Sequence, residues 1–90
     1  MVIARNVEVS GRVQGVFFRA WTVEQAERLQ VNGWVRNCPD GSVEAHLEGD
    51  EGSINWLIDL IGDGPPSARV ANVRVREADV EGATTFEVRR

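Results

Sequence analysis

The sequence has no lysine, a single cysteine and a single histidine among its 90 residues, and each shortage excludes a kind of chemistry. Without lysine, no Schiff base can form on a side-chain amine. A lone cysteine, Cys38, can form no intrachain disulfide and cannot anchor a metal cluster by itself. Adding His46 still leaves too few ligands, because metal sites need clustered donors. We therefore expect neither a metal nor any other cofactor.

The sequence also lacks any apolar run long enough to span a bilayer. Its N-terminus has no basic flank, apolar stretch or cleavage site of a secretion signal. We therefore expect a cytoplasmic protein that does not bind membranes. Apolar residues make up 42% and charged residues 27% of the chain, which is typical of a folded globule. Residues 1–90 are enough for one domain, and nothing in them demands a partner chain, so we expect a monomer.

Positive charge is scarce as well, since the net charge is −4. This balance argues against a general nucleic-acid binder, which is usually basic. The charge is uneven, because Arg5, Arg12 and Arg19 against Glu8 give residues 1–21 a net charge of +2 and leave −6 for the rest. An anion would therefore be held by local groups, against a mildly repulsive overall field.

The period of the apolar pattern changes along the chain and predicts the secondary structure. Alternation predicts strands over residues 2–10, 43–48 and 69–77, and residues that suit a pleated surface predict one over residues 34–37. A short last strand carries Phe86 and Val88. Helical spacing predicts helices from residue 18 to about residue 30 and over residues 54–61. The order β-α-β-β-α-β-β with one-sided elements favours an α+β, ferredoxin-like two-layer sandwich. We expect an antiparallel sheet with both helices on one face, and the pattern leaves the place of the last strand open.

The most informative stretch is residues 10–19 (SGRVQGVFFR), between the first strand and the first helix. Gly11 and Gly15 allow backbone conformations that a Cβ would penalise. Such a loop can turn its N–H groups inward, and the helix start adds unpaired N–H groups and a positive dipole end. This makes a nest for a tetrahedral oxyanion, to which Arg19 can add a charged fork. The alternative is that the glycines only shape a turn and that Arg19 is a solvated helix residue.

Asn37 is the second candidate, at the end of a predicted strand and just before the Pro39-Asp40-Gly41 turn. Its amide can hold a water molecule and orient it, although an asparagine at this place can also cap the turn. His46 falls on the polar side of an alternating strand, and we expect it at the surface. These groups suit hydrolysis of a phosphate whose leaving group departs unaided, such as a carboxylate.

Two motifs resemble the signatures of the acylphosphatase family. Residues 11–19 (GRVQGVFFR) match the first signature, and residues 33–37 (GWVRN), followed by residues 40–44 (DGSVE), match the second. Residues 64–70 and 86–88 agree with the usual C-terminal half of the family. The resemblance covers essentially the whole chain in order, and two matched motifs at the right separation make it specific.

The resemblance implies a ferredoxin-like fold and metal-free hydrolysis of acyl phosphates to a carboxylate and inorganic phosphate. It implies that Arg19 and main-chain N–H groups bind the phosphoryl group, while Asn37 orients the attacking water. The expected catalytic residues are thus Arg19 and Asn37, and the expected substrate-binding residues are Gln14, Gly15, Val16, Phe17, Phe18 and Arg19. One departure is Gln30, where the family often has glycine. If that position needs a positive φ, glutamine costs about 1 kcal/mol.

Two other functions compete with this interpretation. A non-catalytic anion-binding or regulatory module on the same scaffold would bind phosphate without turnover. A nucleic-acid reader would need exposed aromatic side chains on the central strands and a basic face. The positions expected to face outward there are Asn6, Glu8, Glu44, His46 and Glu48. We therefore expect no nucleic-acid partner.

Overall fold

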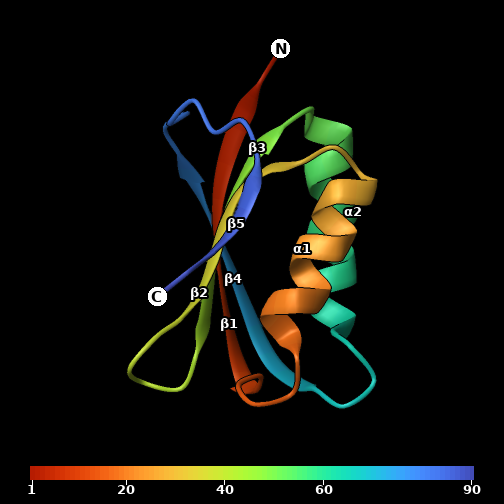
Figure 1. The fold of residues 1–90 in the computed structure, drawn as a ribbon, viewed down its shortest axis with the longest axis vertical. Coiled ribbons are helices and arrows are strands. Elements are labelled where there is room, and N and C mark those ends of the chain that lie inside the picture. Colours follow the sequence, from red (N-terminus) through yellow and green to blue (C-terminus); the bar gives the residue numbers. More distant parts are fainter.

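Two helices cover one face of a five-stranded sheet in the structure, a computed structural model that describes residues 1–90 (Figure 1). The elements, in chain order, are β1 (Ile3–Arg12), α1 (Phe18–Arg28), β2 (Asn32–Asn37), β3 (Val43–Gly49), α2 (Glu51–Asp63), β4 (Arg69–Ala78) and β5 (Phe86–Arg89). This order confirms the predicted ferredoxin-like, two-layer α+β sandwich.

The sheet has the strand order β4-β1-β3-β2-β5. The three pairs among β1 to β4 are antiparallel, as predicted, whereas β5 pairs in parallel with β2. The sheet is therefore mixed, which corrects the expectation of a purely antiparallel one. The reason is the short connection over residues 79–85, which stays at one end of the sheet. β5 therefore starts at the end of the sheet where β4 stops and runs in the opposite direction to β4. This is also the direction of β2, so the pairing of β5 with β2 is parallel.

The core lies between the sheet and the two helices. Alternating residues of β1 and β3 face the helices, and Val7, Val9 and Leu47 are almost completely buried. Burial of each large aliphatic side chain contributes about 1.5–3 kcal/mol. The helices contribute the predicted stripes, of which these residues are buried: Phe18, Thr22, Ala26, Ile54, Leu57 and Ile61. Gln30 follows α1 with a φ of 58°, so this position does need the left-handed conformation that glycine adopts freely.

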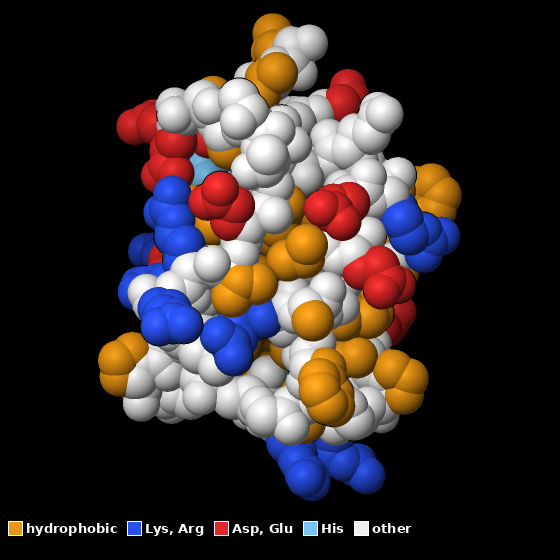
Figure 2. All heavy atoms as spheres, viewed as in Figure 1, with side chains coloured by type: hydrophobic (Ala, Val, Ile, Leu, Met, Phe, Trp, Pro, Cys, Tyr) orange, Lys and Arg blue, Asp and Glu red, His pale blue; other side chains and the backbone are white.

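The face of the sheet without helices carries charges of both signs. Glu8 on β1 lies opposite Arg74 on β4, and Glu44 on β3 lies opposite Arg36 on β2. The second pair forms an ion pair of 2.7 Å. Figure 2 looks at the β5 edge of the sheet rather than at this face, and basic and acidic side chains both occur in that view.

His46 is buried, with 1% of its surface exposed, which corrects the expectation of a surface histidine. Its Nδ1 lies 2.7 Å from Asn6 Oδ1 and its Nε2 lies 2.6 Å from Glu48 Oε2. The connection over residues 79–85 folds over this end of the open face, and the backbone N–H groups of Glu81 and Ala83 donate to the Glu48 carboxylate. The strand pattern cannot show this cover, because it comes from a loop more than 30 residues away in sequence.

Gly33 on β2 leaves no room for a side chain against β3. Its φ is +143°, and a Cβ at this position would lie 1.7 Å from the carbonyl oxygen of His46. Its N–H donates to Thr85 O at 2.8 Å, so the backbone is also fixed from the β5 side. No side chain fits here unless the two strands separate.

We expect Gly33→Ala to lower the free energy of unfolding by about 3 kcal/mol or more, because backbone must move to admit the Cβ. Gly41→Ala is the matched control, since Gly41 also has a positive φ, of +94°, but has nothing within 4 Å of its added Cβ. That control should lose only about 1 kcal/mol, from the conformational cost alone. Urea unfolding measures both values, and equal losses would contradict the overlap argument.

Glu48 links stability to pH. Burial opposes its ionisation, but hydrogen bonds from His46 and from the N–H groups of Glu81 and Ala83 outweigh burial and lower its pKa below 4.5. The folded-state pKa thus lies below the unfolded-state value. The resulting stabilisation is complete above the unfolded-state pKa and is lost as the pH falls through the folded-state pKa.

We expect Glu48→Gln to lower the free energy of unfolding at pH 7 by about 1–3 kcal/mol, since the charged acceptor of two backbone donors is lost. The variant should also lose less stability than the wild type as the pH falls below about 4.5. Urea unfolding across this range tests both effects. The exposed Glu87→Gln variant is the control and should follow the wild type. An unchanged pH dependence in Glu48→Gln would refute the assignment.

Candidate active site

The loop between β1 and α1 is shaped by left-handed backbone. The pairing of β1 with β4 shifts register between Ser10 and Gly11, and Gly15 then adopts a φ of 72°. Phe17 adopts a φ of 63° without being glycine, which costs about 1 kcal/mol or more. Val16, between Gly15 and Phe17, is buried and anchors the loop, and the Ser67 hydroxyl donates to Val16 O at 3.1 Å. The predicted loop is therefore present, with one strained residue at its end.

The N-terminus of α1 has no cap from the protein itself. Phe17 is its N-cap residue, no side chain accepts from its first-turn N–H groups, and no acidic residue lies in that turn. α2 begins differently, because the Asp50 carboxylate accepts the Gly52 N–H and Glu51 follows it. The first turn of α1 thus keeps free N–H donors and an uncompensated positive dipole end, which favour an anion.

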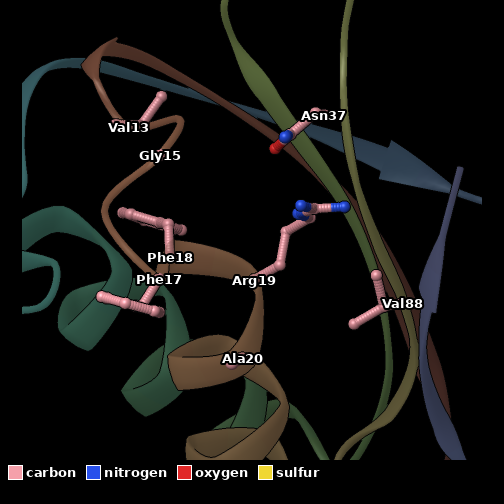
Figure 3. A pocket seen from close by; sticks show the side chains of 8 residues that line it. All are labelled: Val13, Gly15, Phe17, Phe18, Arg19, Ala20, Asn37 and Val88. Atoms are coloured by element: carbon pink, nitrogen blue, oxygen red, sulfur yellow. The ribbon is translucent and has the colours of Figure 1, made fainter.

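Arg19 and Asn37 face each other across one pocket, as Figure 3 shows. Arg19 lies in the first turn of α1 and forms none of the ion pairs within the protein. Asn37 is the last residue of β2, and its Oδ1 is buried without a hydrogen-bond partner. Leaving such an acceptor unpaired costs about 1–3 kcal/mol. The two groups therefore offer an unpaired cation and an unpaired acceptor to whatever enters the pocket.

The pocket has a volume of about 360 Å³. Its lining consists of Val13, Gly15, Phe17, Phe18, Arg19, Ala20, Asn37 and Val88. The guanidinium is the single charged group among them, so the pocket is electropositive. Five of the expected site residues line it, whereas Gln14 and Val16 are not among the lining residues. The sequence did not indicate Val13, Ala20 or Val88 as site residues, and Val88 could not be inferred because the pattern left the place of β5 open.

The side chain of Gln14 joins the loop to the hairpin that follows Asn37. Its Nε2 donates to Cys38 O at 2.8 Å and to Ser42 O at 2.9 Å. The hairpin turn is capped by Asp40, whose carboxylate accepts from the Ser42 hydroxyl at 2.6 Å and from its N–H at 3.0 Å. These two hydrogen bonds, from the Ser42 side chain and then its backbone, lower the pKa of Asp40. Since Asp40 caps the turn, the Asn37 side chain is not the turn cap.

The comparisons with known proteins agree with this architecture. A sequence model of the acylphosphatase family matches residues 5–88. An acylphosphatase of Rubrobacter xylanophilus is 58% identical over 85 residues, covering 93% of this chain and 77% of that one. The structure of an acylphosphatase from Coxiella burnetii is 44% identical, with a TM-score of 0.94, covering 98% of this chain and 93% of that one. The crystal structure of the Bacillus subtilis acylphosphatase is 33% identical, with a TM-score of 0.95 and complete coverage of both chains.

The family match and the two structures cover nearly the whole chain, including both motifs and all the elements that line the pocket. The chain therefore belongs to the acylphosphatase family, and it is a hydrolase of that class.

We expect Gln14→Ala to lower the free energy of unfolding by about 1–2 kcal/mol, because two hydrogen bonds between the loop and the hairpin are lost. The loss stays small since Cys38 O and Ser42 O each keep a backbone partner. Gln25→Ala is the control, because the Gln25 side chain only accepts an exposed bond from Arg28. Urea unfolding compares the two variants, and an equal, near-zero change in both would show that Gln14 does not join loop and hairpin.

Proposed function

We propose that the pocket hydrolyses the carboxyl-phosphate bond of acyl phosphates, with the phosphoryl group between the loop and Arg19. Main-chain N–H groups from Gln14 to Phe18 would donate to the phosphoryl oxygens, and the guanidinium would add two parallel charge-assisted hydrogen bonds. The uncapped start of α1 and the unpaired Arg19 support this arrangement. The observation that carries the proposal is the buried, unpartnered Oδ1 of Asn37 that faces Arg19.

Asn37 is proposed to orient the attacking water. Its Oδ1 accepts one O–H bond, which directs a lone pair of the water oxygen at phosphorus. As the new P–O bond forms, the bond from phosphorus to the acyl oxygen breaks, and the carboxylate leaves with the electron pair. Carboxylic acids have pKa values near 4, so this leaving group needs no proton at neutral pH. The proton released from the water passes to solvent or to the phosphate product.

We propose that this hydrolysis needs no metal, since the pocket lining offers no carboxylate, imidazole or thiolate to bind one. The Arg19 fork and the main-chain donors would supply the positive charge that stabilises the negative charge on the phosphoryl oxygens in the transition state. We expect the rate to be unchanged by excess chelator. A loss of activity that added Mg²⁺ restores would contradict this part of the proposal.

No helix of the structure has the length and apolar character needed to cross a membrane. We propose that residues 1–90 act as one domain and as a monomer in the cytoplasm, with no nucleic-acid partner. The support is that one chain supplies every residue lining the pocket and that the open sheet face carries both signs of charge.

We expect Arg19→Ala to lower kcat/KM for acetyl phosphate by about 10²–10³-fold or more, because the guanidinium stabilises charge in the transition state. Asn37→Ala should lower kcat strongly while leaving inhibition by inorganic phosphate nearly unchanged. Arg28→Ala, in the last turn of the same helix and outside the pocket, is the control and should match the wild type. Steady-state assays at pH 7 with circular dichroism of each variant measure these effects.

Other outcomes assign different roles. Phosphate inhibition abolished by Asn37→Ala would contradict the division of roles between Arg19 and Asn37. A folded wild type that binds phosphate but hydrolyses acyl phosphates only at the background rate would make the chain an anion-binding module.

A further inference from the structure

The pocket is larger than a phosphoryl group requires. Its volume is about 360 Å³, whereas a phosphoryl group consists of only four heavy atoms, one phosphorus and three oxygens. The lining is also mostly apolar, and its only polar side chains are those of Arg19 and Asn37. Part of the pocket therefore suits the other half of the substrate.

Val88 is the apolar side chain that is best placed to contact this other half. Figure 3 shows Val88 beside Arg19, on the opposite side of that residue from Gly15, with its side chain directed into the pocket. The ring of Phe17 also borders the pocket, but Figure 3 shows it directed away from Arg19 and Asn37. The side of the pocket next to the guanidinium is thus an aliphatic wall made by Val88, and Ala20 lines the pocket from α1.

The register of β5 explains why this wall is open. Val88 lies opposite the buried Val35 of β2, and Phe86, two residues earlier on the same face, is only 7% exposed. Val88 itself is 48% exposed, although it faces the helix layer like Phe86. Ala20 in the first turn of α1 has too small a side chain to cover it. An apolar surface left open next to an anion site gains free energy when an apolar group of the ligand covers it.

Resting on the proposed function, we propose that Val88 and Ala20 form an acyl subsite that favours acyl phosphates with apolar acyl groups, such as benzoyl, over acetyl phosphate. The acyl group lies against the Val88 methyl groups while its phosphoryl group is held by the loop and Arg19. Such contacts are made in the bound substrate and in the transition state alike, so they act mainly on KM.

The test compares kcat/KM for benzoyl phosphate and acetyl phosphate in three variants. Val88→Thr keeps the β-branched shape but replaces a methyl group by a hydroxyl. Ala20→Leu enlarges the second aliphatic side chain of the lining and keeps a good helix former. Val75→Thr is the matched control, because Val75 is 43% exposed on β4, at the opposite edge of the sheet and outside the pocket.

We expect Val88→Thr and Ala20→Leu each to lower the benzoyl-to-acetyl ratio of kcat/KM by about threefold to tenfold. This is less than the 10–200-fold that a closed apolar pocket gives per methylene, since Val88 is half exposed. The change should lie mainly in KM for benzoyl phosphate, and the ratio of Val75→Thr should equal that of the wild type.

An unchanged ratio in both pocket variants, with a wild type that hydrolyses both substrates, would overturn the acyl subsite and leave the proposed function intact. An equal fall of the ratio in Val75→Thr would also overturn it, because the effect would then be general to the sheet edges. A wild type that hydrolyses neither substrate would overturn the proposed function and the subsite together.

Discussion

The contact on which the site depends is the pair of hydrogen bonds from Gln14 to the carbonyl groups of Cys38 and Ser42. Arg19 and Asn37 belong to different elements, and the chain between them forms α1 and returns along β2. The core fixes these elements only through their buried faces, and neither side chain belongs to the core. The Gln14 amide joins the loop before α1 directly to the hairpin after β2. Its reach sets the distance between the anion loop and the residue proposed to orient water, and small errors in such distances are costly for catalysis.

The pocket collects several features that are unfavourable in the free protein. Phe17 is left-handed without being glycine, α1 begins without a cap, Arg19 has no counter-ion, and Asn37 has a buried acceptor without a partner. The backbone of Phe17 and the unpaired acceptor of Asn37 each cost stability alone, and the start of α1 lacks the cap that Asp50 gives α2. A tetrahedral anion with an adjacent water would satisfy the last three at once. Their coincidence in one pocket is therefore better explained by ligand binding than by four separate defects of folding.

The sequence is sufficient where the determinants are local. Helical spacing at Phe18, Thr22 and Ala26, and alternation at Val7 and Val9, reflect one-sided burial within single elements, and they predict the layers correctly. Arg19 and Asn37 stand out because each lies at the end of an element. The parallel pairing of β5 and the burial of His46 could not be predicted, since both depend on where residues 79–85 cross the sheet. No local pattern encodes that crossing, and Phe17 gives no sign of its left-handed backbone because it is not glycine.

The two halves of the pocket differ in whether their residues can be inferred from local sequence. The proposed phosphoryl site is built from residues 14–19 and Asn37, within two short segments whose roles can be inferred from the residues themselves. The proposed acyl subsite depends on Val88, which reaches the pocket only because β5 runs parallel to β2 at the sheet edge. An edge strand has one free side and can change its exposed side chains without disturbing a neighbour on that side. The preference for the acyl group can therefore change through β5 while the loop, Arg19 and Asn37 keep the same geometry toward phosphate.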